Sequence, residues 1–232
     1  MDLNDRLLEI YQKHWPNLLN VISEDDIAAK KIHYPLLINI PQEYERVPIK
    51  LFVVGQQTRG GRKGVQHLNI NELQQWYKYF NLGEKRGRSP FWYACHLLYK
   101  TLNPSAPQYG FVWSNLIKID ENNKRPSPDL EEKICSAFPV LPFEIEVAHP
   151  DVVVFFTGPN YDSRLKKTFD GLIFEPMEGY TPRTFVRVVH KMLPYNSFRV
   201  YHPVYINRSK PYRLQDIYNE ITTSLQKPVQ QP

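Results

Sequence analysis

Cysteine is scarce in this chain, which excludes a fold built on several disulfide bonds. The 232 residues include two cysteines, Cys95 and Cys135, and neither lies in a metal-ligand spacing. Apart from His202, the histidines do not cluster with carboxylates at ligand spacing. We therefore predict neither a disulfide framework nor a metal site.

Long apolar runs are also lacking. No stretch approaches the ~18 apolar residues of a membrane span, and no early run resembles a signal peptide. The sequence thus predicts a soluble, intracellular protein of cytoplasmic location, without a membrane partner, and we expect a monomer. Glycine contributes ten of 232 residues, against a usual ~7%, whereas proline contributes twenty, against a usual ~5%. Such a composition predicts stiff connections and frequently interrupted elements.

What the chain does contain is typical of a globular protein. With 42% hydrophobic and 23% charged residues, it is neither disordered nor fibrous, and its length suits one large α/β domain or two small ones. Aromatic residues make up 13% of the chain, more than one core needs, so we expect some to line a surface or a pocket. The net charge of +5 favours an anionic partner without requiring one.

Short apolar runs alternate with helical patterns along most of the chain. Strands separated by helices indicate a parallel sheet that is covered on both faces. We predict a three-layer α/β/α fold with a central four-stranded, mainly parallel sheet. The predicted strands cover residues 49–54, 111–117, 151–156 and 198–201. The predicted helices cover 2–14, 69–80, 90–102, 128–149, 160–169 and 212–225, and the helical segment 128–149 is expected to be broken by Pro139 and Pro142.

The same patterns divide the chain into three segments, the second of which contains an insertion. Residues 1–48 are interpreted as an N-terminal helical lead-in packed on the domain, and residues 49–225 as the α/β domain itself. Residues 171–197 contain two β-like runs and are interpreted as an insertion or hairpin. Residues 226–232 are expected to form a loose tail.

Polar and cationic residues follow each predicted strand. Ligands of parallel sheets bind at the carboxyl ends of the strands, so these loops predict one shared site. The loops begin Gly55-Gln56-Gln57-Thr58-Arg59, Ser114-Asn115, Thr157-Gly158-Pro159-Asn160 and His202-Pro203-Val204-Tyr205. Cations gather at the same edge: Arg59, Arg62 and Lys63, then Arg164, Lys166 and Lys167, then Arg208, Lys210 and Arg213.

Each motif has a plainer interpretation when it is considered alone. Gly55 can simply end a strand, and Asn115 can fix a loop through local hydrogen bonds. His202 precedes proline and is extended for steric reasons, so it can be a structural histidine. The cationic runs can be solvated loop charges, and Phe91 and Trp92 can belong to the core.

In combination, the four motifs resemble the uracil-DNA glycosylase superfamily. They read GQQTRG, SNL, VVVFFTGPNY and HPVYINR, in that order, each at the carboxyl end of its predicted strand. In the best-known branch the first motif is Gly-Gln-Asp-Pro-Tyr, the second strand ends in Asn, and the last motif is His-Pro-Ser-Pro-Leu. The resemblance covers about residues 49–225. It implies the same α/β/α fold, binding of a flipped uracil or related base in DNA, and hydrolysis of its N-glycosidic bond without a cofactor.

The resemblance also implies roles for individual residues. Asn115 matches the Asn that reads the Watson–Crick edge of the flipped base. His202 matches the His that stabilises negative charge on uracil O2. Ile206 matches the Leu that enters the duplex in place of the base. The remaining expected roles are base stacking by Phe91 or Trp92, contacts from backbone amides of Gln56 and Gln57, and phosphate binding by Arg59, Arg208 and Lys210.

One departure from the family pattern concerns the water-orienting residue. The family's Asp falls at Gln57, and Thr58 stands where the best-known branch has Pro. An amide can position water, but it neither accepts a proton nor stabilises a cationic sugar by charge. Weak activity, a changed substrate and no activity are all compatible with Gln57. The alternatives to a glycosylase are a catalytically silent module that binds nucleic acid or a nucleobase, and an enzyme acting on a free nucleoside or nucleotide. The predicted partner is single- or double-stranded DNA.

Overall fold

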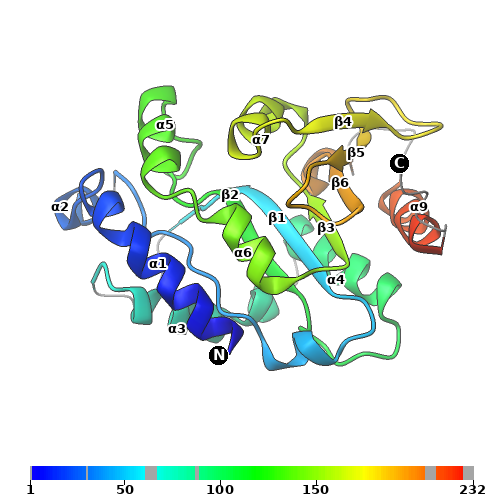
Figure 1. Ribbon diagram of the computed structural model, residues 1–232, viewed down its shortest axis with the longest axis horizontal. Helices are drawn as coiled ribbons and strands as arrows, with labels where there is room; N and C mark the ends of the chain where they lie inside the picture. Colours follow the sequence, from blue (N-terminus) through cyan, green and yellow to red (C-terminus); the bar gives the residue numbers. More distant parts are fainter. Residues whose placement is uncertain (1, 30, 61–66, 87–88, 207–212, 227–232) are drawn as a thin grey trace.

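The computed structural model describes residues 2–29, 31–60, 67–86, 89–206 and 213–226, and its centre is a six-stranded sheet with helices on both faces (Figure 1). The strand order is β2-β1-β3-β6-β5-β4. The strands are β1 (Leu51–Gln57), β2 (Val112–Ile117), β3 (Val152–Phe155), β4 (Ile173–Pro176), β5 (Phe185–Val189) and β6 (Asn196–Val200).

The four strands predicted from apolar runs form the parallel part of this sheet. β2, β1, β3 and β6 are neighbours in that order and all run parallel. Every residue of β2 and β3 is buried, as expected of strands covered on both faces. β1 differs from the prediction because it extends to Gln57, so Gln56 and Gln57 belong to the strand and not to the following loop.

The prediction of a four-stranded sheet is wrong, and residues 171–197 are the reason. Two strands from this segment continue the sheet: β5 pairs antiparallel with β6, and β4 pairs antiparallel with β5. Phe185 and Val188 of β5 are buried. β6 is an interior strand, because it pairs with β3 on one side and with β5 on the other. The two β-like runs therefore form a hairpin, as one interpretation held, but the hairpin belongs to the central sheet.

The longer helices follow the predicted pattern with one clear exception. The first helix was expected to end before Pro16, yet α1 continues through this proline, although proline removes one backbone hydrogen bond of the helix. Leu18 is fully buried and holds the last turn of α1. The helices are α1 (Leu3–Leu19), α2 (Glu24–Ala28), η1 (Gln42–Arg46), α3 (Ile70–Phe80), η2 (Asn81–Arg86), α4 (Pro90–Leu102), α5 (Pro128–Ala137), α6 (Leu141–Ala148), η3 (Pro159–Tyr161), α7 (Asp162–Thr168), α8 (Pro203–Ile206) and α9 (Leu214–Gln226).

Neighbouring residues of β2 show the two faces of the sheet. Ser114 donates a hydrogen bond to Glu144 of α6, on the face where α1 packs against α6 (Figure 1). The ring of Trp113 stacks on Tyr77 of α3 and meets the edge of Trp92 of α4, on the other face. In the part of the chain that the structure describes, no helix is long and apolar enough to cross a bilayer.

Candidate nucleobase site

A cavity of about 740 Å³ opens where β1 and β2 end and where the chain leaves β6. Its volume lies within the range of ~300–1,000 Å³ that is usual for small-molecule sites. We call it the strand-end cavity. It is lined by Gly55, Gln56, Gln57, Thr58, Arg59, Gly60, Trp76, Phe80, Ser89, Pro90, Phe91, Trp92, Trp113, Asn115, Asn123, His202, Val204 and Tyr205.

Seven of the residues singled out from the sequence therefore meet in one place. The structure does not describe Arg208, Lys210 or the side chain of Ile206, so the expected duplex wedge and two of the expected phosphate contacts lie outside the described residues. Arg59 is exposed at the cavity wall. The candidate site residues that line the cavity are Gln56, Gln57, Arg59, Phe91, Trp92, Asn115 and His202.

Asn115 lies on the cavity wall because its neighbour in the sheet is glycine. Gly55 of β1 is paired in register with Asn115 of β2. A Cβ atom at Gly55 would collide with Oδ1 of Asn115, so only glycine leaves room for the amide in this position. The residue is only 3% exposed, and its Nδ2 donates a hydrogen bond of 3.3 Å to Oγ1 of Thr58.

His202 follows β6 and faces the same cavity as a neutral imidazole. Burial lowers the pKa of His202 from 6.5 to about 4, so the ring is uncharged at pH 7. The backbone N–H of Val204 donates to Nδ1 at 3.4 Å. Since Nδ1 accepts, the single ring proton of the neutral form is on Nε2, and this nitrogen remains a hydrogen-bond donor.

The two aromatic candidates have different positions. Phe91 is half-buried, and its ring stacks on that of His202 with centroids 5.6 Å apart and planes at 18°. Trp92 is 5% exposed and is packed among Phe80 and Trp113. Of the two, Phe91 therefore presents more of its ring to a ligand, while Trp92 mainly forms the wall behind it.

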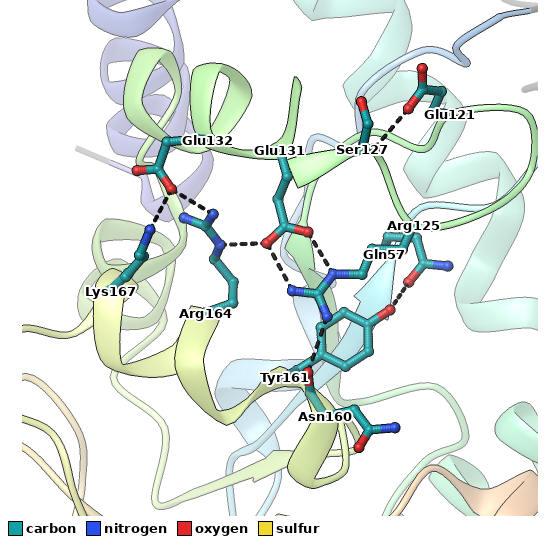
Figure 2. A network of polar contacts seen from close by, with 10 residues as sticks. All are labelled: Gln57, Glu121, Arg125, Ser127, Glu131, Glu132, Asn160, Tyr161, Arg164 and Lys167. Atoms are coloured by element: carbon teal, nitrogen blue, oxygen red, sulfur yellow. Dashed lines mark hydrogen bonds and ion pairs between the residues drawn. The ribbon is translucent and has the colours of Figure 1, made fainter. Parts of the chain in front are cut away.

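Gln57 is held by a contact that the sequence did not reveal. The hydroxyl of Tyr161 donates to Oε1 of Gln57 at 2.6 Å (Figure 2). Burial raises the pKa of Tyr161 to about 12, so the phenol keeps its proton at neutral pH and acts as the donor. The Gln57 amide is thus oriented by Tyr161, with one lone pair of Oε1 already used.

A series of ion pairs holds Arg125 against the ring of Tyr161. The guanidinium of Arg125 lies over the Tyr161 ring, 4.2 Å from its centroid, and is paired with Glu131 (Figure 2). Arg164 joins Glu131 to Glu132, and Lys167 also binds Glu132. Arg164 and Lys167, which were expected to add to a basic edge, are therefore engaged in ion pairs with these carboxylates.

Gln56 is directed toward the neighbouring strand. Its Nε2 donates to the backbone oxygen of Thr157, just after β3, at 2.8 Å. The side chain thereby joins the ends of β1 and β3 and closes one side of the strand-end cavity. Its carbonyl oxygen and the second hydrogen of Nε2 are not used by this bond and are available to a ligand.

The charge balance of the cavity is one-sided. No carboxylate is among the described residues that line it, whereas Arg59 is. Within the same described residues, no group of three or more His, Cys, Asp or Glu side chains could hold a metal ion. The arrangement can bind a flat polar ring and donate a hydrogen bond to an oxygen that gains negative charge. It offers no carboxylate as a general base.

The sequence had drawn attention to some of these additional contacts and not to others. In the sequence, Thr58 stands out only as a departure from the family pattern, and Tyr161 only as the end of the GPNY motif. Arg125 gave no signal, because its contact with Asn160 joins residues 35 positions apart. Pairings of this kind depend on the folded chain and leave no local pattern.

Comparison with known proteins leaves the family open: no model of a protein family matches the chain, and a search of curated proteins finds no significant match. The functional interpretation of the strand-end cavity therefore depends on its geometry and on the motifs that form it.

Proposed function

We propose that this protein is a DNA glycosylase-like protein that binds a flipped uracil or a related base in the strand-end cavity and hydrolyses its N-glycosidic bond. The observation that carries the proposal is the position of His202. A neutral imidazole with its proton on Nε2 shares the cavity with the amide of Asn115 and the ring of Phe91. These are a donor, an edge-reading amide and an aromatic face.

The chemistry assigned to His202 follows from its protonation state. When the bond between the sugar C1′ and the base nitrogen breaks, its electron pair moves to the base, and negative charge develops on a carbonyl oxygen of the base. The Nε2–H of His202 donates a hydrogen bond to that oxygen, which stabilises the leaving anion. The neutral ring can donate this hydrogen bond because its single proton is on Nε2.

Attack of water on the sugar receives less assistance from the cavity than departure of the base does. Water adds its oxygen to C1′ and releases a proton to solvent, and Gln57 orients it through the lone pair that Tyr161 leaves available. Asn115 reads the base edge, and Arg59 contributes positive charge near the DNA backbone. The absence of a cavity-lining carboxylate among the described residues implies a slow reaction.

That same feature favours a second candidate function. A catalytically silent module would keep the base-binding residues and dispense with the general base. Such a protein would hold a base-containing oligonucleotide in the strand-end cavity without releasing the base. The two candidates therefore differ in product formation and share binding.

A glycosylase assay separates them. Oligonucleotides with one deoxyuridine or one damaged base, single- and double-stranded, are incubated with the protein, and abasic sites are detected by alkaline cleavage. We expect cleavage that falls by about 10²–10³-fold in His202→Ala, the usual effect of losing one such donor. His149→Asn is the matched control, because His149 is exposed at the end of α6 and Asn tolerates its positive φ of 44°.

The outcomes assign the function. Product from the wild type and from His149→Asn, but not from His202→Ala, supports the glycosylase. Binding without product in all three proteins supports the silent module. If the wild type neither binds nor cleaves any of the oligonucleotides, both proposals are wrong.

A further inference from the structure

The hydrogen bonds around Thr58 have a defined direction. Thr58 follows β1, is 1% exposed, and its hydroxyl lies 2.6 Å from the backbone oxygen of Lys118. A carbonyl oxygen can only accept, so the single hydroxyl proton of Thr58 goes to Lys118. Oγ1 of Thr58 must then accept from Asn115, whose amide nitrogen lies 3.3 Å away.

This direction determines how the amide of Asn115 is turned. Its Nδ2 faces Thr58, and its Oδ1 lies against the α-carbon of Gly55 at the cavity wall. Turning the amide by 180° would bring Oδ1 toward Oγ1 of Thr58, and two acceptors would then face each other inside the protein. The cost of such an unsatisfied buried pair disfavours the turned form.

We propose that Thr58 is the residue that determines base specificity in the strand-end cavity, because it holds Asn115 with Oδ1 toward the ligand. The inference rests on the proposed binding of a base, whether or not that base is then released. A ring N–H beside a carbonyl, as in uracil, donates to Oδ1 and accepts from the second hydrogen of Nδ2. A ring nitrogen without a proton beside an amino group, as in cytosine, places acceptor against acceptor and donor against donor.

Thr58 acts here through Asn115, so it is a positioning residue. Thr58→Val keeps the shape of the side chain but removes the hydroxyl, and the amide of Asn115 loses its preferred orientation. Thr58→Ser keeps the hydroxyl and should keep the orientation. Comparison of these two variants therefore separates the effect of the Thr58 hydrogen bond from the effect of side-chain packing.

Binding to two oligonucleotides tests the inference. Each is a single-stranded oligo(dA) with one central 2′-fluoro-deoxyuridine or 2′-fluoro-deoxycytidine, because the fluorine slows hydrolysis and leaves the base edge unchanged. Affinities are measured by fluorescence anisotropy at one fixed salt concentration. We expect the wild type and Thr58→Ser to prefer the uracil oligonucleotide by at least about tenfold, and Thr58→Val to bind both within about threefold.

A second measurement needs no ligand. Neutron diffraction from crystals of the deuterated protein shows directly which end of the Asn115 amide carries deuterium. Deuterium on the end that faces Thr58 supports the inference, and an oxygen at that end overturns it. Thermal unfolding of all three proteins establishes that the substitutions leave the fold intact.

The results distinguish this inference from the proposed function. If the wild type binds neither oligonucleotide, the proposed function is wrong for these bases, and the neutron data alone decide the orientation. If binding occurs and Thr58→Val keeps the full preference for uracil, Thr58 does not determine specificity, although the cavity still binds a base.

Discussion

Ser114 and Asn115 are adjacent in β2, yet they belong to two very different polar regions. Ser114 points to a closed network in which Glu144 accepts hydrogen bonds from Tyr11, Ser114 and Lys118. Asn115 points to the strand-end cavity, where the buried Nε1 of Trp113 has no partner among the described residues. One face of the strand has its polar groups satisfied from within the protein, and the other does not.

This difference separates polar groups that stabilise the fold from polar groups that can bind a ligand. A buried polar group without a partner costs about 1–3 kcal/mol, so a closed network is what stability favours. Unsatisfied groups persist in a cavity where a ligand can satisfy them. We therefore expect substitutions in the network of Glu144 to affect stability, and substitutions in the strand-end cavity to affect binding and chemistry.

Removing Glu144 tests the closed side of this comparison and should have the largest effect. Glu144→Ala leaves the buried ammonium of Lys118, which is 3% exposed, without its carboxylate. We expect a loss of about 3–5 kcal/mol in the free energy of unfolding, the usual result of breaking a buried ion pair. Urea denaturation measures it. Glu146→Ala, an exposed change on the same helix, is the control and should cost less than about 0.5 kcal/mol.

A Glu144→Ala variant as stable as the Glu146→Ala control would show that the network contributes little. Asn115→Ala sharpens the comparison, because it changes a side chain on the opposite face of the same strand. It should reduce oligonucleotide binding and cost much less stability than Glu144→Ala.

The pH dependence of stability tests the cavity side through His202. The pKa of this histidine is about 4 in the folded protein and about 6.5 when the chain is unfolded. As the pH falls from 6.5 to 4, the unfolded chain binds a proton there that the folded chain does not. His202 therefore makes the free energy of unfolding fall by up to about 1.4 kcal/mol per pH unit in this window, and it adds no slope above pH 7.

Comparison of variants isolates the contribution of this one group. His202→Asn should lose part of the slope between pH 6.5 and 4, whereas His149→Asn should keep the slope of the wild type. Equal slopes in all three proteins, from urea denaturation at half-unit pH steps, would mean that His202 is not held neutral by burial.

The parts of the fold that have local signals were predictable from sequence. The apolar runs of β2 and β3 and the break between α5 and α6 are examples, as is the start of α4 at Pro90. The pairing of β5 with β6 was not predictable, because a short strand with an exposed end does not specify its neighbour. Pro16 is a local signal that gave a wrong prediction: it indicates a helix end, but α1 continues through it because the packing of α1 outweighs the local cost of a proline.

The candidate site shows the same division. Motifs at strand ends located Asn115 and His202, since parallel topology brings strand ends to one edge. The hydrogen bond between Tyr161 and Gln57 joins residues 104 positions apart, and the pKa of His202 depends on burial from several elements. Neither protonation nor the direction of a hydrogen bond has a sequence pattern.

The smallest expected effect concerns the missing negative charge in the strand-end cavity, and it tests whether the cavity lacks only this for efficient hydrolysis. Gln57→Glu places a carboxylate where Tyr161 already donates a hydrogen bond, which favours the ionised form of the new side chain. That charge stabilises the positive sugar in the transition state and supplies a weak general base. General-base catalysis contributes about 10²–10⁴-fold when well positioned, so even a poorly placed carboxylate should raise the rate of uracil release by at least about tenfold.

Gln57→Met, similar in size but without charge or hydrogen bonds, is the matched control and should show no gain. The gain should vanish when His202→Ala is combined with Gln57→Glu, because the two groups act on opposite sides of the breaking bond. If Gln57→Glu folds, binds the uracil oligonucleotide and releases base no faster than the wild type, then charge at this position is not what limits the reaction, and Gln57 already suffices for water or the protein is a binding module.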